Sequence, residues 1–313
     1  MEQWFRPMGL NLRVSTNTPE LASAVCEAYD PFGSGDETAA ADLRFDFAQS
    51  AARSAAEPNY RISGEKAELR TGDQVVLSVD VASGLATGCF PGNLVADRSF
   101  FRLHVLHFAL SAALPGRGFL GVHAACIAIN GVAVLLRGPR GSGKTVLTYA
   151  AAVRGFPVIA DSTVWIAPDE VTWWGIPRWI YLRRSAQALF PELAAGPTVS
   201  LGGDMKVEAD LARVSAAVTL PCIRRGIIVC IERQAEETAY LKPISESEAL
   251  RLWSRGAAGN ELDAWNYQAR VARLLGEPCY LLNSADDIGR ALELIAAECA
   301  AGCEIISNRL ADL

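Results

Sequence analysis

The chain has 313 residues, of which half are hydrophobic and a fifth are charged, and its formal net charge is −6 at pH 7. This composition excludes an intrinsically disordered chain, and the acidic balance argues against non-specific nucleic-acid binding as the main task. The eight cysteines are scattered without a C-x-x-C pair, so the sequence predicts neither a zinc site nor a disulfide-rich scaffold.

The start of the chain, MEQWFRPMGL, lacks the basic-then-apolar pattern of an export signal. No run of about 18 apolar residues interrupts the sequence, so we expect no membrane span. Together with thiols that fit a reducing compartment, these features predict a cytoplasmic protein with no membrane partner.

The first part of the chain predicts a small β-rich domain. Alternating apolar and polar residues, typical of half-buried strands, occur at residues 10–14, 43–47, 59–63 and 74–81. None of these segments carries residues that suggest chemistry. The length of the chain favours two domains, and we place them at residues 1–95 and 96–313.

A strand and a hairpin precede the most informative segment. Residues 98–114 favour a largely buried helix, and residues 122–129 favour a strand. Asn130-Gly131 then predicts a tight hairpin into the next strand, residues 132–137. Because the two strands are of similar length, antiparallel register would bring His123 close to the loop that begins at residue 138. His123 is therefore a candidate catalytic residue, the alternative being a structural core histidine.

The loop after residue 137 carries a complete G-x-x-x-x-G-K-[ST] pattern, the Walker A or P-loop motif. A helix up to about residue 154 and a short strand ending on Asp161 come next, so the motif has the strand–loop–helix context that it requires. The predicted nucleotide-binding residues are Gly138, Pro139, Arg140, Gly141, Ser142, Gly143, Lys144 and Thr145.

The physical chemistry of this loop predicts binding of a nucleoside triphosphate with Mg²⁺. Glycines let backbone amides approach a ligand closely, and successive N–H groups at a helix N-terminus form an anion-binding nest. Lys144 would reach the β- and γ-phosphates, and Thr145 would place its hydroxyl on Mg²⁺. Asp161 is expected to hold Mg²⁺ or to accept a proton. Whether ATP or GTP is the donor is left open by the sequence.

These segments resemble a known family. The residues His-Ala-Ala-x5-Asn-Gly, the loop Gly-x-x-Gly-x-Gly-Lys-Thr and the segment Arg-Gly-Phe-Pro-Val-Ile-Ala-Asp are similar to the C-terminal catalytic domain of HPr kinase/phosphorylase. They are closer still to smaller HPr-kinase-like proteins, including serine kinases that tailor lasso peptides. The resemblance is firm over residues 119–168. Residues 203–211 are similar to a further segment of that group.

The resemblance implies a fold and an activity. The fold would be an α/β P-loop kinase-like domain with a mixed central sheet, preceded by the β-rich domain. The activity would be transfer of the γ-phosphoryl group of ATP to a serine hydroxyl, with Asp161, His123 and Lys144 as catalytic residues. The family has two consecutive acids where this chain has Asp161-Ser162. That departure leaves open whether the second acid is needed.

Several basic residues are further candidates for binding. Arg140 could add positive charge at the γ-phosphate, the alternative being a loop position that faces solvent, and Lys206 could contact phosphate or substrate. Residues 171–184 contain three tryptophans and three arginines. Two of the arginines, Arg178 and Arg183, are candidates for binding an acceptor peptide with an acidic or phosphorylated part. The alternative is a β-hairpin whose aromatic side chains pack in the core.

Three functions remain open from the sequence. The first is an ATP-dependent kinase acting on a serine of a peptide or small protein, of which a lasso precursor peptide would be one example. The second is a nucleotide-binding regulatory module without transfer activity, and the third is a small-molecule kinase. We expect no nucleic-acid partner, while assembly into a homo-oligomer is possible.

Overall fold

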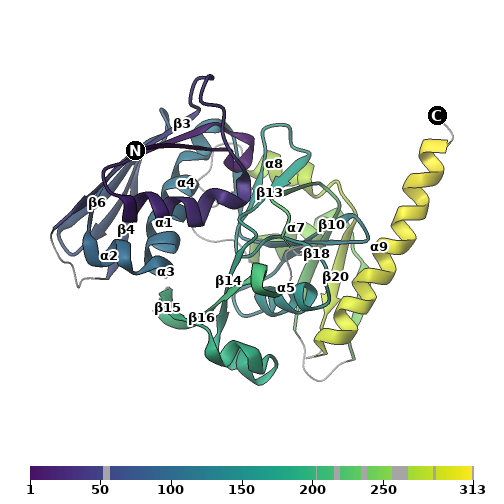
Figure 1. Ribbon diagram of the computed structural model, residues 1–313. Helices are drawn as coiled ribbons and strands as arrows, with labels where there is room; N and C mark the ends of the chain where they lie inside the picture. Colours follow the sequence, from purple (N-terminus) through teal and green to yellow (C-terminus); the bar gives the residue numbers. More distant parts are fainter. Residues whose placement is uncertain are drawn as a thin grey trace. The chain divides into compact units, whose positions relative to one another are not determined.

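The computed structural model describes the chain except for residues 52–56, 202, 215–218, 234–237, 256–266, 285–286 and 312–313. The chain divides into two compact units, Met1–Phe119 and Leu120–Leu313 (Figure 1). The observed division lies beyond the predicted one at residues 95 and 96. The reason is that the helical segment after residue 97 packs on α1 and on β6 of the first unit.

The first unit is a mixed seven-stranded sheet in the order β1-β2-β3-β7-β6-β5-β4. Its strands are β1 (Glu2–Phe5), β2 (Leu12–Thr16), β3 (Leu43–Ser50), β4 (Pro58–Ser63), β5 (Lys66–Thr71), β6 (Gln74–Asp80) and β7 (Leu85–Pro91). Its helices are α1 (Pro19–Tyr29), α2 (Gly92–Ala96), α3 (Arg98–Phe100), the π-helical η3 (Phe101–Leu106) and α4 (His107–Ala113). Three 3-10 turns complete it: η1 (Pro7–Gly9), η2 (Asp30–Phe32) and η4 (Pro115–Arg117).

Side-chain alternation decides which face of this sheet is covered. In β3, Leu43, Phe45 and Phe47 are buried, whereas Arg44 between them is exposed. The strands at residues 10–14, 43–47, 59–63 and 74–81 are confirmed to within a few residues. The β-rich character of this unit therefore follows from period-two hydrophobic patterning.

The second unit is built on a six-stranded sheet in the order β11-β9-β10-β18-β20-β19. Its strands are β9 (Ala125–Ile129), β10 (Val132–Arg137), β11 (Val158–Ala160), β18 (Ile227–Glu232), β19 (Tyr240–Pro243) and β20 (Cys279–Asn283). Strands β10, β18 and β20 are mutually parallel, whereas β9 and β19 run antiparallel to their neighbours. The sheet is therefore mixed, as predicted.

Two smaller sheets and four main helices surround the six-stranded sheet. One sheet contains β8 (Leu120–Val122), β12 (Val164–Ile166), β13 (Thr172–Trp174) and β17 (Cys222–Arg224); the other contains β14 (Trp179–Arg183), β15 (Thr198–Leu201) and β16 (Asp204–Asp210). The helices are α5 (Lys144–Val153), α7 (Glu246–Arg255), α8 (Tyr267–Leu274) and α9 (Ile288–Ala311), with α6 (Leu211–Val214), η5 (Arg184–Ala188) and η6 (Pro191–Ala195) as short turns. Every helix in the described part of the chain is too short or too polar to cross a membrane.

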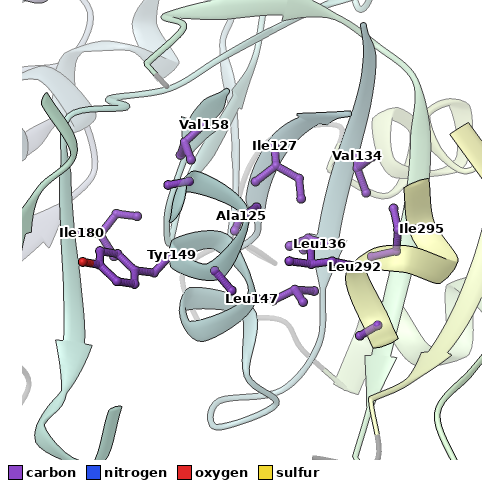
Figure 2. Close-up of a cluster of buried hydrophobic side chains, with 14 of the residues drawn as sticks. Ala125, Ile127, Val134, Leu136, Leu147, Tyr149, Val158, Ile180, Leu292 and Ile295 are labelled. Atoms are coloured by element: carbon purple, nitrogen blue, oxygen red, sulfur yellow. The ribbon is translucent and has the colours of Figure 1, made fainter. Parts of the chain in front are cut away.

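The two faces of the six-stranded sheet are buried by different elements. On one face, Ile127, Val134 and Leu136 pack against α5 and α9, and Ile180 of β14 joins them (Figure 2). On the other face, alternate residues of the same strands, such as Ala128 and Leu135, pack against α7, α8 and the four-stranded sheet. Because both faces are covered, these strands are almost continuously hydrophobic.

Gly175 is one of the positions where even a methyl group is too large for the packing. A Cβ on Gly175 would lie 2.0 Å from the carbonyl oxygen of Ile159 and 2.5 Å from Cβ of Ala160, both in β11. We therefore expect Gly175→Ala to lower the free energy of unfolding by about 1 to 3 kcal/mol, because β11 must move to admit it. Urea unfolding would measure the loss.

Gly276→Ala is the matched control in the same unit. Its Cβ would meet no atom closer than 3.3 Å, the Arg273 carbonyl oxygen. We expect a change within about 0.5 kcal/mol for this variant. Equal losses in the two variants would contradict the packing argument.

Candidate functional site

The sheet brings three predicted site residues to one edge. Strand β9 pairs antiparallel with β10 on one side and with β11 on the other, so β10 and β11 run in the same direction. Gly138 follows the end of β10 and Asp161 follows the end of β11, while His123 lies just before the start of β9. The carboxyl ends of parallel strands are the edge at which α/β folds bind ligands.

The glycine loop has the backbone that an anion-binding nest requires. Gly141 and Gly143 have φ of 89° and 95°, a left-handed region that other residues rarely adopt. A Cβ on Gly138 would lie 2.7 Å from Oγ of Ser142 and 2.8 Å from the Ile231 carbonyl oxygen. Helix α5 begins at Lys144, directly after Gly143, so the N–H groups of its first turn face the loop. The predicted strand–loop–helix is confirmed.

Lys144 lies inside this loop. The residue is buried, and its Nζ donates hydrogen bonds to the carbonyl oxygens of Gly138, at 2.7 Å, and Pro139, at 3.2 Å. An ammonium group held by the rim of the loop is poised to contact a phosphate bound within it.

The environment of Asp161 disfavours the ionised form of its carboxyl group. The residue as a whole is partly exposed, but its Oδ1 is buried and makes no hydrogen bond within the described residues. Burial raises the pKa of Asp161 to about 6, against the opposing effects of the Thr145 hydroxyl and of the positive charges on Lys206 and Lys144. A carboxylate with a pKa near the working pH suits proton transfer.

His123 and Ser162 are joined beside Asp161. The His123 ring nitrogen Nδ1 lies 2.9 Å from the Ser162 carbonyl oxygen, and the Ser162 hydroxyl donates to Oδ2 of Asp161 at 3.4 Å. Ser162 has φ of 76°, a strained conformation for a residue with a side chain. The prediction that His123 lies near the loop edge is confirmed, although it lies between β8 and β9 rather than within one strand.

Lys206 lies in the same site through β16. Burial lowers the pKa of Lys206, and Arg140 and Arg183 lower it further, whereas Asp161 and Asp204 raise it. The structure therefore brings the P-loop, the aspartate and this lysine together, although Lys206 lies more than 40 residues after Asp161 in the sequence. Cross-strand pairing places Lys206 opposite Arg183 of β14.

Asp204 was not singled out by sequence reasoning, and it joins two of the basic candidates. Arg140 donates to its Oδ2 at 2.6 Å, and Arg183 lies 3.8 Å from the same oxygen. The Arg140 and Asp204 side chains are 66% and 44% exposed, so this ion pair is accessible to solvent. Asp204 lies within the 203–211 segment that resembles the family, but its approach to the loop is a long-range contact that the sequence does not show.

Arg178 and its segment differ from expectation. Arg178 makes a two-pronged pair with Asp210, with both N–O distances 3.0 Å, and stacks on Trp179. Residues 171–184 do not form a hairpin, because β13 and β14 belong to different sheets. Trp173 is fully buried in the core. Of the two arginines predicted to bind substrate, Arg183 lies beside Lys206. Arg178 instead pairs with Asp210 at the end of β16, in the three-stranded sheet.

The residues present fit a magnesium nucleotide. Among the described residues, no three His, Cys, Asp or Glu side chains gather as a metal site. Mg²⁺ in nucleotide sites is held by one or two protein oxygens plus phosphates, so a full protein cage is not required. The Thr145 hydroxyl and the Asp161 carboxylate lie together beside the loop and can supply oxygen ligands, and the buried Oδ1 has unused hydrogen-bonding capacity.

Comparisons with known proteins give a distant likeness. No protein-family model and no curated protein sequence matches the chain. Among solved structures, the HPr(Ser) kinase/phosphatase from Coxiella burnetii is similar at 11% sequence identity and a TM-score of 0.33, over 60% of this chain and 96% of that chain. A likeness this remote does not decide activity, which rests on the geometry of the site.

The raised pKa of Asp161 predicts a pH-dependent effect of Asp161→Asn on stability. The protonated form is favoured by folding, so its contribution is full below the ordinary pKa of 3.8 and is lost as pH rises through about 6. We therefore expect the variant to gain stability relative to the unchanged protein between pH 4 and pH 8, by about 1 to 3 kcal/mol. Urea unfolding of both proteins at several pH values measures this difference.

Asp169→Asn provides a control of opposite sign. Burial alone would raise the pKa of Asp169, but hydrogen bonds from Thr172 and Val171 lower it. Asp169 therefore stabilises the fold above its ordinary pKa, and this contribution is lost as pH falls through the lowered value. The variant should lose relative stability as pH rises. If Asp161→Asn shows no pH dependence of its own, the burial argument fails.

Proposed function

We propose that the chain is an ATP-dependent phosphotransferase that moves the γ-phosphoryl group to a serine hydroxyl of a peptide or small protein. One observation carries the proposal: the Asp161 carboxyl group lies beside the Thr145 hydroxyl, in the field of Lys144 and Lys206, at the edge that holds the glycine loop. A nest for phosphate, two cations and a base of raised pKa are the parts that in-line transfer needs.

In the proposed reaction the acceptor oxygen forms a bond to the γ-phosphorus while the bond to the bridging oxygen breaks. The hydroxyl proton passes to Asp161, and the electron pair of the broken bond leaves with ADP. Mg²⁺, held by Thr145 and Asp161, would supply charge neutralisation on the phosphates. The loop amides and Lys144 would orient the triphosphate, and His123 would support the site through Ser162.

The basic residues of β14 and β16 support an acceptor with a negative group near its hydroxyl. Lys206 and Arg183 lie on neighbouring strands, and Asp204 is the acid that accompanies them. Arg178 is less available for this role, because its guanidinium is paired with Asp210. A lasso precursor peptide is one acceptor of the proposed class to test.

Ser162 favours one alternative, a nucleotide-binding module without transfer. It stands where the resembling family has a second acid. The site therefore has the Ser162 hydroxyl, 3.4 Å from Oδ2 of Asp161, in place of a second carboxylate. The small-molecule kinase is less favoured. It would need the aromatic segment, residues 171–184, to form a closed substrate pocket, whereas Trp173 of this segment is fully buried in the core.

Removing the loop lysine tests nucleotide binding and transfer together. We expect Lys144→Ala to slow transfer from ATP by about 100-fold or more, because a cation that neutralises the phosphates is lost. Calorimetry with ATP and with GTP, in the presence of Mg²⁺, measures affinity. Mass spectrometry of serine-containing peptides measures transfer.

Lys242→Ala is the matched control, since Lys242 is exposed and lies on β19. It should leave both measurements unchanged. If folded Lys144→Ala protein binds and transfers like the unchanged chain, the proposal is lost.

Asp161→Asn separates the kinase from the binding module. The kinase proposal expects nucleotide binding to persist, because the loop amides, Lys144 and Thr145 remain. Transfer should fall by about 100- to 10,000-fold, because the proton acceptor is removed. The rate of the unchanged protein should rise with pH as Asp161 loses its proton. Nucleotide binding by the unchanged protein with no phosphorylated product from any serine peptide would favour the alternative.

A further inference from the structure

A charged side chain is buried immediately before the phosphate loop. Arg137 is the last residue of β10 and has an exposed fraction of 0%. Its neighbours along the strand on the same face, such as Leu135, belong to the apolar core. Taking a guanidinium out of water is costly, and an apolar residue of similar volume is often equally stable in such a position. Packing alone therefore does not explain why a charged residue occupies position 137.

The guanidinium of Arg137 joins two backbone segments that are distant in sequence. One terminal nitrogen donates to the His123 carbonyl oxygen at 2.6 Å, and the other donates to the Trp253 carbonyl oxygen at 3.1 Å. The planar group also lies over the Trp253 indole, 4.4 Å from its centroid. A planar guanidinium can stack on the indole and donate to two carbonyl oxygens at the same time, and a lysine ammonium cannot reproduce this geometry.

Each end of this bridge is itself held. On the side of the site, the His123 ring is bonded to the Ser162 carbonyl oxygen, and Ser162 follows Asp161. On the far side, the indole nitrogen of Trp253 donates to the Tyr267 hydroxyl at 2.9 Å, and both residues are buried. The bridge thus connects the residues beside Asp161 with α7 and α8, which form the opposite wall of the core.

We propose that Arg137 is a positioning residue for phosphoryl transfer. It fixes the backbone at His123, and through His123 the strained turn at Ser162, while its own main chain leads directly into Gly138. The phosphate loop and the turn that carries Asp161 are thereby held at a set distance. The inference rests on the proposed function for its effect on rate, but its geometric part can be tested without activity.

Arg137→Lys is the test, because lysine keeps the charge but cannot stack and bond to both carbonyls. We expect the nucleotide affinity to stay within about threefold, since the loop itself is unchanged, and kcat to fall by about 10- to 100-fold from misplacement of the reacting groups. The KM for nucleotide should change little. A purely structural role would lower stability without this split between kcat and affinity.

The histidines provide a readout that does not depend on activity. The chain has only three, and His104 and His107 belong to the first unit. Nuclear magnetic resonance of the imidazole groups should show the His123 signals moving in Arg137→Lys, with the signals of the other two unchanged. Trp253→Leu removes the stacking partner from the opposite side, and it should move the same His123 signals and lower kcat in the same direction.

Arg270→Lys is the matched control. Arg270 also donates to carbonyl oxygens, those of Ile166 and Ala167, and is not part of the site. This variant should leave kcat and the His123 signals unchanged. If folded Arg137→Lys and Trp253→Leu proteins keep the original kcat and the original His123 signals, the inference is overturned. Failure of the unchanged protein to bind or transfer phosphate would instead remove the proposed function, and the His123 signals would still decide the geometry.

Discussion

The hydrogen bonds that join β9 to β10 on one side and to β11 on the other set the direction of all three strands. Because β9 is antiparallel to both, the ends of β10 and β11 meet at one edge of the sheet. This pairing brings the glycine loop, Asp161 and His123 to the same edge of the sheet. A tight turn at Asn130-Gly131, with φ of 52° and 79°, makes this pairing local and hence easy to form.

The site combines groups that would be unfavourable alone. Burial works against the charge of Asp161 and against that of Lys206, yet each lies in the field of the other. Such mutual support is characteristic of sites whose pKa values are adjusted for chemistry. The strained turn at Ser162 adds to this picture, since positive φ at a residue with a side chain persists only where the surroundings enforce it.

The sequence predicted the features that depend on neighbours in the chain. The loop between residues 138 and 145, the hairpin before it and the strand that ends on Asp161 all follow from local signals. The separation of β13 from β14 into two sheets did not, because it depends on pairing with strands elsewhere in the chain. Nor did the pairing of Arg178 with Asp210, which lies 32 residues away. The unit boundary was misplaced for the same reason: a helix shows its apolar face in the sequence but not the sheet that it covers.

The ion pair between Arg140 and Asp204 has a consequence for ionic strength. If Arg140 contacts the bound phosphate, the incoming anion competes with Asp204 for the same guanidinium, and both attractions operate through solvent-exposed groups. Dissolved salt weakens each of them over a distance of about 10 Å at 0.1 M. The two effects oppose one another, so ligand uptake should respond to salt less steeply than the number of cations around the loop would suggest.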